Sequence, residues 1–387
     1  MSALKLFLNE QVQVFWQNAW DAACKIGNNP ELGYEEFFAV ETLSQLLKEH
    51  GFEIECPVAG MDTAFVARFK GYRPGPRIAL LAEYDALPEI GHGCGHNLIG
   101  VASVGAAIAL SKSLSLPGEV WVIGSPAEET SGGKVTLVEE GIFQDIDVAM
   151  MFHPGSQNVA EISSLALDAL EFVFLGKAAH AVAAPLYGVN ALDALIDFFQ
   201  RVKVLQRELN DGYINGIITE GGISPNVIPE RAVARFYLRA RQRKVLERLR
   251  KKVLRCAQDA AKAINGKVTW SKFEHSYDEM RTNTALAQAF VKNLRELGVK
   301  YISPPQSALG SVDMGNVSQV VPAIHPYLSL GNGVYIPHTR NFAKACLSSS
   351  GRELLLLAMQ ALAYTGWDVL NDEDLLERIK GEHKSKS

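Results

Sequence analysis

Cysteine is scarce in this sequence, and basic residues are not in excess. The 387 residues include only Cys24, Cys56, Cys94, Cys256 and Cys346, an odd and widely scattered set. A disulfide framework needs dense, even-numbered cysteines in a small secreted domain, so the pattern excludes one and favours reduced thiols. Lys and Arg number 38 against 43 Asp and Glu, a net charge of −5. This balance argues against a protein built mainly to hold nucleic acid or an anionic membrane.

Long hydrophobic runs are also missing. The longest, from Ile99 to Leu110, is too short to span a bilayer, which takes about 18 apolar residues or more. The first residues, MSALKLFLNEQVQ, lack the charged start and apolar run of a signal peptide. With 48% hydrophobic and 21% charged residues, the composition is that of a globular protein and excludes a disordered or collagen-like chain. We therefore expect a cytoplasmic protein without a membrane partner.

Apolar runs of strand length alternate with helical stretches in the first part of the chain. The first 50 or so residues are expected to be helical, with Gly51 as a stop signal. Further on, the sequence predicts strands at 63–69, 77–84, 119–126 and 147–152 and helices at 97–113 and 132–142. Apolar strands bounded by helices are typical of an α/β fold with a mostly parallel sheet covered by helices.

The pattern changes near Ala166. Between there and residue 275 the predicted elements follow the order β-α-β-β-α-β, which is that of a ferredoxin-like unit. After Tyr277 the first pattern resumes, and the polar tail from Glu377 is expected to fray. The sequence thus predicts a discontinuous α/β domain, residues 1–165 and 278–387, with a smaller α+β domain, residues 166–277, inserted in it.

The densest group of potential metal ligands is AEYDALPEIGHGCGHN, Ala82 to Asn97, between a predicted strand and a helix. It contains Glu83, Asp85, His92, Cys94 and His96. Ligands bind at the carboxyl ends of strands in open α/β sheets, and thiolate, imidazole and carboxylate together form a zinc-type ligand set. The alternative interpretation is a Gly-rich turn with incidental polar residues.

Three further motifs add ligands or a proton acceptor. GSPAEETSGG ends another predicted strand and contains Glu128 and Glu129, of which one can bind a metal while the other takes a proton from water. MMFHPG places His153 at the end of a third strand, and His338 lies in a late loop. A ligand set large enough for two metal ions is formed by Cys94, His96, Glu129, His153 and His338.

The inserted domain carries candidate substrate-binding residues. His180 lies between a predicted strand and helix, and Asn226 lies in the GGISPNVIPE turn. In RAVARFYLRA the apolar alternate positions place Arg239 on the more polar face, either as a solvated residue or as a clamp for a carboxylate. The Arg-rich run that follows is interpreted as a solvated helix face, and His92 and His325 as residues that shape loops.

These motifs resemble those of peptidase family M20, in its amidohydrolase branch of aminoacylases and amino-acid-conjugate hydrolases. The resemblance covers almost the whole chain through AEYDALPE, GHGCGHN, PAEE, FHPG, AAHA, GGISPNVIPE and GSVDMGNVS. It looks most like the sub-branch of aminobenzoyl-glutamate hydrolases and β-alanyl-lysine-type dipeptidases. It implies a metallo-exopeptidase-like catalytic domain with an inserted lid that also forms a homodimer.

The resemblance further implies a role for each matched residue. The metal ligands would be Cys94, His96, Glu129, His153 and His338. Glu128 would be the general base, and Asp85 the acid that orients the ligands. His180 would reach the partner subunit's active site and stabilise the oxyanion, while Asn226 and Arg239 would hold the carboxylate end of the substrate.

Three positions depart from the wider family. Glu83 stands where much of the family has a metal-binding His and this branch often has Asp. Cys94 replaces a bridging carboxylate, as is usual in the branch, and Asn97 stands where many relatives have Asp. The resemblance implies two divalent ions per chain, with Zn favoured and Mn, Co or Ni as alternatives, since mixed S, N and O ligands suit all four.

The sequence therefore predicts hydrolysis of an amide bond in an N-acyl amino acid or amino-acid conjugate. A dipeptidase or carboxypeptidase of the same family is one alternative. Another is a thiol hydrolase with Cys94 as nucleophile and His96 or His92 as base, and a third is a non-catalytic relative that binds such a conjugate. The expected partners are the small substrate and a second copy of the chain, without nucleic acid.

Overall fold

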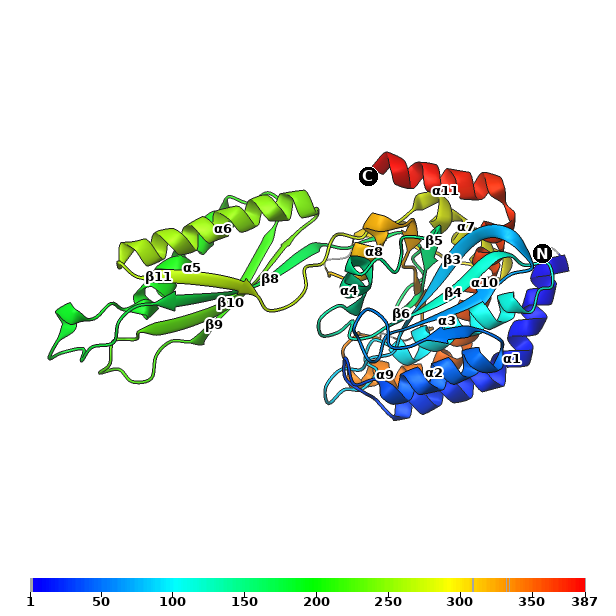
Figure 1. Cartoon of the computed structure of the whole chain (residues 1–387), viewed down its shortest axis with the longest axis horizontal. Coiled ribbons are helices and arrows are strands. Elements are labelled where there is room, and N and C mark those ends of the chain that lie inside the picture. The colour runs from blue at the N-terminus through cyan, green and yellow to red at the C-terminus, as the bar shows by residue number, and fades with distance from the viewer. Residues whose placement is uncertain (1–2, 308–309, 332, 334, 387) are drawn as a thin grey trace. The chain divides into compact units, whose positions relative to one another are not determined.

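The computed structural model describes residues 3–307, 310–331, 333 and 335–386. These residues form two compact units (Figure 1). Unit 1 contains residues 3–163, 280–307 and 313–386, and unit 2 contains residues 164–279 and 310–312. The chain therefore leaves unit 1 at residue 164, forms most of unit 2, returns to unit 1 at residue 280 and later adds residues 310–312 to unit 2.

Unit 1 is built on a six-stranded sheet in the order β1-β2-β4-β3-β5-β13. The strands are β1 (Glu53–Glu55), β2 (Phe65–Lys70), β3 (Arg73–Glu83), β4 (Pro117–Ser125), β5 (Val148–Met150) and β13 (Ala323–Ile324). The strands β4, β3, β5 and β13 run parallel, whereas β1 and β2 are antiparallel to their neighbours. The predicted α/β fold with a mostly parallel sheet is confirmed.

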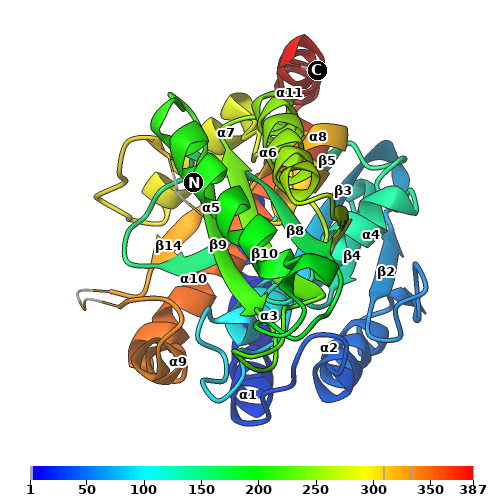
Figure 2. The same ribbon diagram turned by 90° about the vertical axis from the view of Figure 1, so that its left-hand side faces the viewer.

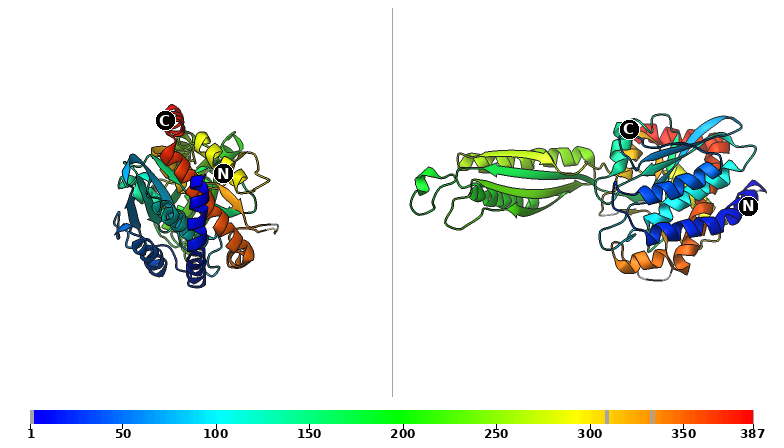
Figure 3. Two further views of the ribbon diagram at one scale, coloured as in Figure 1. Left: turned by 90° about the vertical axis from the view of Figure 1, so that its right-hand side faces the viewer. Right: turned by 60° about the horizontal axis from the view of Figure 1, so that its bottom comes forward.

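Helices cover this sheet, which explains why β3 is apolar and buried on both faces towards its carboxyl end. Every residue of α3 (His96–Ser111) is buried, because β3, β4, α1 (Ala3–Asn28), α2 (Phe37–Glu49) and α10 (Ser349–Asn371) all pack against it. In the right-hand view of Figure 3, the blue helices α1 and α2 lie beside the cyan helix α3. The remaining helices of unit 1 are α4 (Gly133–Glu139), α7 (Thr284–Glu296), α8 (Met314–Val320), α9 (Arg340–Cys346) and α11 (Glu373–Lys386).

Most of the first 50 residues are helical, as expected. They form two helices, because the chain leaves the helical path at Asn29 and Pro30 cannot continue an α-helical hydrogen-bond ladder. The expectation for the other end of the chain is wrong. The polar tail forms α11 instead of fraying. The Glu382 carboxylate accepts the backbone N–H groups of Thr284 and Ala285 at 2.8 and 2.9 Å, which caps α7 and anchors the tail.

Two short parallel pairs complete unit 1: β6 (His153–Gly155) with β14 (Tyr327–Ser329), and β7 (Ile162–Ser163) with β12 (Gln306–Ser307). The first pair fixes the backbone at His153. No helix within the described ranges has the length and apolarity needed to cross a bilayer.

Unit 2 is an antiparallel four-stranded sheet in the order β11-β8-β10-β9. Its elements are β8 (Ala166–Leu175), the short 3₁₀ turn η1 (Pro185–Tyr187), α5 (Ala191–Arg207), β9 (Tyr213–Glu220), β10 (Arg231–Ala240), α6 (Arg243–Ala263) and β11 (Lys267–Lys272). Figure 2 shows α5 and α6 side by side on one face of this sheet. Phe172, Phe198 and Phe236 pack together between the two layers. The unit has the predicted ferredoxin-like topology.

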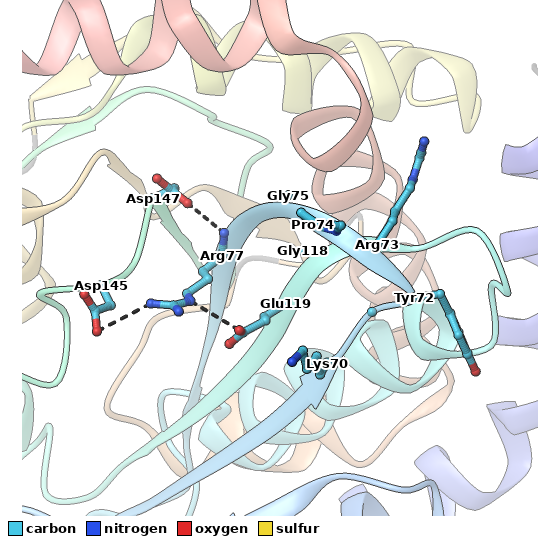
Figure 4. A pocket seen from close by; sticks show the side chains of 11 residues that line it. Lys70, Tyr72, Arg73, Pro74, Gly75, Arg77, Gly118, Glu119, Asp145 and Asp147 are labelled. Atoms are coloured by element: carbon cyan, nitrogen blue, oxygen red, sulfur yellow. Dashed lines mark hydrogen bonds and ion pairs between the residues drawn. The ribbon is translucent and has the colours of Figure 1, made fainter.

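The amino ends of the parallel strands in unit 1 border an open cavity of about 650 Å³ (Figure 4). Arg77 of β3 lines this cavity, and both its backbone and its guanidinium contact acidic side chains. Its backbone N–H donates to Asp147 Oδ2 at 2.7 Å, and its guanidinium lies 3.4 Å from Glu119 Oε1 and 3.4 Å from Asp145 Oδ2. The three acidic side chains at this edge of the sheet thus all lie against Arg77.

Candidate metal centre

The carboxyl ends of β3, β4 and β5 bring three of the sequence motifs to the opposite edge of the sheet. Glu83 is the last residue of β3, with Asp85 just beyond it. Glu128 and Glu129 follow β4, and His153 follows β5. Since neighbouring parallel strands end at the same edge, segments distant in sequence meet there.

The glycine-rich loop adds Cys94 and His96 to this edge. Gly95, between them, has φ of 76°, a left-handed conformation that favours glycine. A Cβ at this position would lie 2.8 Å from Pro154 Cγ and 2.9 Å from Cys346 Sγ, so no larger residue fits there without a shift. Helix α3 then begins at His96, which fixes the base of that side chain.

Two sets of side chains suited to a metal ion share Cys94. In one, the ligand atoms of Cys94, His96 and His153 all lie within 4.8 Å of one another. In the other, those of Cys94, Glu129 and His338 do so. His96, Glu128 and Glu129 form a third such set. The fold therefore gathers all five predicted ligands and the predicted base.

Asp85 fixes the orientation of His96. Its Oδ1 lies 2.9 Å from His96 Nδ1, and its Oδ2 accepts the backbone N–H of Glu129 at 2.9 Å. Burial alone would lower the pKa of His96, but the Asp85, Glu83 and Glu129 carboxylates raise that pKa well above its ordinary value. Among the described residues His96 Nε2 has no hydrogen-bond partner, and a cation bound there would take the place of its proton.

The other two histidines are held in different ways. His153 Nδ1 lies 2.7 Å from the Pro154 carbonyl, which makes Nδ1 the donor and leaves a lone pair on Nε2. Burial lowers the pKa of His153 to about 4, so the ring is neutral, as a ligand must be. His338 has φ of 63°, and its Nε2 lies 3.6 Å from Glu129 Oε2.

Glu128 and Cys94 have environments that bear on their chemistry. Burial, followed by the nearby Glu83, Asp313 and Glu129 carboxylates, raises the pKa of Glu128 well above its usual range, which favours a role in proton transfer. Burial and Glu129 also raise the pKa of the Cys94 thiol. A nucleophilic cysteine needs a lowered pKa, so the structure speaks against the thiol-hydrolase alternative. A metal ion would deprotonate the thiol on binding.

A buried ion cluster adjoins this site, and sequence reasoning assigned it no role. Lys134 Nζ lies 2.6 Å from Glu83 Oε1 and 2.8 Å from Asp313 Oδ1. Burial opposes the charged form of Glu83, but Lys134 holds the pKa of that carboxyl at about 2. Nothing in the sequence near Lys134 marks it, because a lysine in the first turn of a short helix is ordinarily solvated.

His92 and His325, interpreted as residues that shape loops, are both buried. Neither belongs to a set of potential ligands among the described residues. The His325 ring lies 5.5 Å from that of His153, edge to face, and so contributes to the wall behind it.

The predicted substrate-binding residues lie in unit 2, and the fold separates them. His180 Nδ1 accepts the backbone N–H of Ala183 at 3.1 Å. The residue after His180, Ala181, donates its backbone N–H to the Asn226 carbonyl at 2.9 Å. His180 and Asn226 are therefore neighbours beyond the start of β10. Arg239 lies near the other end of β10, eight residues after Arg231, or about 27 Å along the strand.

Asn226 and Arg239 of one and the same chain therefore lie too far apart to hold one carboxylate together. Two residues that far apart in one sheet cannot grip a single small group. The Arg239 guanidinium lies 5.0 Å from the Tyr237 ring, on the face that the alternation of β10 predicted.

The buried thiol, imidazoles and carboxylates at the strand ends provide the metal ligands and the base that a metal-dependent hydrolase needs. His96 Nε2 and Glu129 Oε1 are both buried and have no hydrogen-bond partner among the described residues, which is costly unless a cation completes them. The donor set, one sulfur with imidazole nitrogens and carboxylate oxygens, fits a divalent transition metal.

The chain belongs to peptidase family M20/M25/M40, whose sequence profile matches residues 79–357. It is 38% identical to the Xaa-Arg dipeptidase of Mus musculus, over 93% of this chain and 88% of that protein. It is 32% identical to one of the polypeptides of p-aminobenzoyl-glutamate hydrolase from Escherichia coli K12, over 77% of this chain and 66% of that protein. The chain is thus an enzyme, a metal-dependent hydrolase of amide bonds, as predicted.

A solved structure shows the same fold. It is a Bacillus subtilis protein described as a dinuclear metal binding peptidase from the M20 family, with a TM-score of 0.68 and 20% identity. The match covers 90% of this chain and 98% of that one. Both units of the present chain therefore have counterparts in a family fold.

Proposed function

We propose that this enzyme hydrolyses the amide bond of a dipeptide or an N-acyl amino acid with two divalent metal ions bound around Cys94. The observation that carries the proposal is the pair of ligand sets that share the Cys94 thiol. His96 and His153 would complete one site, and Glu129 and His338 the other. Zn is the favoured metal, with Mn, Co or Ni as alternatives.

The chain's own residues divide the work of hydrolysis. When bound, divalent ions lower the pKa of a coordinated water from 15.7 toward about 7 and polarise the scissile carbonyl. Glu128 takes a proton from the attacking water and returns it to the departing amine, for which its raised pKa suits it. Asp85 keeps His96 and the Glu129 backbone in register, so that the ligands and the base hold one geometry.

The residues of unit 2 would bind the substrate from two chains. Arg239, with its planar guanidinium, suits a substrate carboxylate. His180 and Asn226 lie together at the far end of the same sheet, so we assign them to the active site of a second copy in a homodimer. There His180 would donate to the developing oxyanion, a contribution that is typically worth about 10²–10³ in rate.

Dipeptides are the favoured substrates. The support is the 38% identity to the mouse Xaa-Arg dipeptidase over nearly the whole chain. An N-acyl amino acid is the second candidate, because the 32% identical Escherichia coli protein is named for the hydrolysis of aminobenzoyl-glutamate. All five cysteines are free, which suits the cytoplasm, where we place the enzyme.

Elemental analysis, paired with hydrolysis of a small panel before and after chelation, tests the proposal. The panel contains a dipeptide ending in arginine, a β-alanyl dipeptide, an N-acetyl amino acid and aminobenzoyl-glutamate. We expect about two metal ions per chain, and activity that a chelator removes and Zn, Mn, Co or Ni restores. Metal-free protein with undiminished activity would overturn the mechanism and return attention to the Cys94 thiol.

Mixing two inactive variants tests the assignment of His180 to a second chain. His180→Ala and Glu128→Gln each disable every active site when present alone. In a random mixture, half of the dimers are mixed and each has one site with both residues intact, so about a quarter of wild-type activity should return. No recovery after verified exchange of chains between dimers would show that His180 acts within its own chain.

A further inference from the structure

The cluster of Glu83, Lys134 and Asp313 takes no part in the roles assigned so far, yet it is among the most buried groups of unit 1. The side chains of Lys134 and Asp313 are 0% exposed and that of Glu83 is 2% exposed. Asp313 binds Lys134 twice, through Nζ at 2.8 Å and through the backbone N–H at 3.1 Å. Such charges are costly to bury, so their position calls for an explanation.

The two oxygens of Glu83 have different surroundings. Oε1 lies 2.6 Å from Lys134 Nζ, whereas Oε2 has no hydrogen-bond partner among the described residues. Oε2 points instead towards His96, 3.4 Å from Nε2, which also has no partner. Lys134 thus holds one oxygen and leaves the other directed at the face of His96 that is free for a cation.

The separation of these two atoms matches that of two ligands on one ion. Ligands about 2.1 Å from a metal in tetrahedral geometry lie about 3.4 Å apart. By comparison, His96 Nε2 lies 3.8 Å from Glu129 Oε1 and 3.9 Å from Glu128 Oε2. Glu83 Oε2 is therefore nearer to His96 Nε2 than the carboxylate oxygens of Glu128 and Glu129 are.

We propose that Glu83 supplies an additional carboxylate ligand to the metal ion held by His96, and that Lys134 and Asp313 position it. The inference rests on the proposed function, because it presupposes a cation at His96. Lys134 supplies a permanent positive charge that offsets the extra carboxylate, and Asp313 anchors Lys134 from the other side. Glu83, a potential ligand by its residue type that was left out of the five-residue ligand set, is thereby a ligand in this chain.

The cluster itself offers a matched pair of variants. Glu83→Gln and Asp313→Asn each neutralise one buried carboxylate on Lys134, but only the first alters the oxygen that faces His96. Thermal unfolding of the metal-free proteins checks that both fold. Metal affinity is measured by competition with a chromophoric chelator, and the visible absorption spectrum of the Co²⁺-loaded proteins reports on the ligands.

We expect Glu83→Gln to weaken binding of one ion by about 10–100-fold, and to change the Co²⁺ spectrum. Asp313→Asn acts on Glu83 only through Lys134, so it should lose less affinity than Glu83→Gln and should keep the wild-type Co²⁺ spectrum, because the ligand oxygen itself is unchanged. Wild-type affinity and spectrum in Glu83→Gln would overturn the inference, as would an equal loss in both variants. Absence of metal from the wild-type protein would instead overturn the proposed function.

A measurement on the wild-type chain keeps the inference testable should Glu83→Gln fail to fold. In a crystal structure of the protein loaded with Zn²⁺ or Mn²⁺, Glu83 Oε2 should lie within direct coordination distance of the ion at His96, about 2.0–2.5 Å. Any longer separation would overturn the assignment of Glu83 as a ligand.

Discussion

The two edges of the sheet in unit 1 both carry several acidic residues, but they treat them differently. At the amino ends of β3 and β4, the acids surround Arg77 beside an open cavity, and each of Glu119, Asp145 and Asp147 lies against a group of Arg77 (Figure 4). Asp147 also pairs with Lys380. The acidic side chains there are matched by basic side chains of the folded chain itself.

At the carboxyl ends the acids are buried, and part of their bonding capacity is unused. Glu83 Oε2, Glu129 Oε1 and His96 Nε2 are buried atoms without hydrogen-bond partners among the described residues. Leaving such groups unpaired costs stability, whereas paired surface charges contribute little either way. The comparison teaches that unsatisfied buried groups, more than acidic residues as such, mark where a ligand completes the molecule.

The largest expected contrast between the two edges is in turnover. Glu128→Gln should lower kcat by about 10³-fold, within the usual range for general acid–base catalysis, while metal content and Tm stay near wild type. Glu119→Gln, the same change at the amino edge, should leave kcat within about twofold. Steady-state kinetics on the preferred substrate and elemental analysis measure both. Wild-type turnover in Glu128→Gln would remove Glu128 as the base.

The next contrast is in metal affinity. Asp85→Asn weakens the hold on His96 Nδ1 and should reduce metal affinity by about 10–100-fold, as loss of a carboxylate behind a metal-binding histidine typically does. Asp147→Asn changes the acceptor for the Arg77 N–H and should cost no more than about 1 kcal/mol of stability, with no change in affinity. Chelator competition distinguishes them, and equal affinities would show that Asp85 does not act through His96.

The smallest effect is in the pH dependence of stability. It concerns Glu36, which binds the loop that contains Glu128 and Glu129. Glu36 Oε1 accepts the Ala127 N–H at 2.8 Å, and Oε2 accepts the Thr63 hydroxyl at 2.7 Å. Burial raises the pKa of Glu36 from 4.5 to about 7 in the folded chain. The folded state thus binds this proton more tightly, so the stability that the group contributes is lost as pH rises from about 4.5 to about 7.

Replacing Glu36 by Gln removes that titration. The stability of Glu36→Gln relative to wild type should therefore rise between about pH 4.5 and about pH 7, by about 3 kcal/mol. Thermal unfolding of the metal-free proteins across this range measures the difference. The Thr63 hydrogen bond lowers the pKa of Glu36, so Thr63→Val should move the window to higher pH. A difference that does not vary with pH would contradict the assignment.

Much of the fold could be predicted because its signals are local. The apolar run of β3, the helical stretch of α3 and the β-α-β-β-α-β order of unit 2 each depend on residues close together in sequence. The tail was mistaken for a frayed end, since its polar sequence has no local signal for docking. The tail helix is anchored by Glu382, which accepts hydrogen bonds from Thr284 and Ala285, almost 100 positions earlier in the chain.

The candidate site divides in the same way. Residue types and their place after strands pointed to Cys94, His96, Glu129, His153 and His338, and the fold brings these residues together. The contact between Lys134 and Asp313 could not be predicted from the sequence. The two residues are 179 positions apart, and no local pattern around either of them indicates burial or an ion pair. The wide separation of His180 from Arg239 likewise follows from strand length and register, which motifs do not encode.

By itself, the sequence determined the α/β architecture, the inserted unit, the family and the ligand types, because hydrophobic periodicity and motif chemistry are written in neighbouring residues. Only the tertiary structure decided which atoms are left without partners, which lysine offsets the buried carboxylates, and which substrate-binding residues can act together. Those properties depend on contacts between segments that meet only after folding, where burial makes each unpaired charge costly and so gives each contact its consequence.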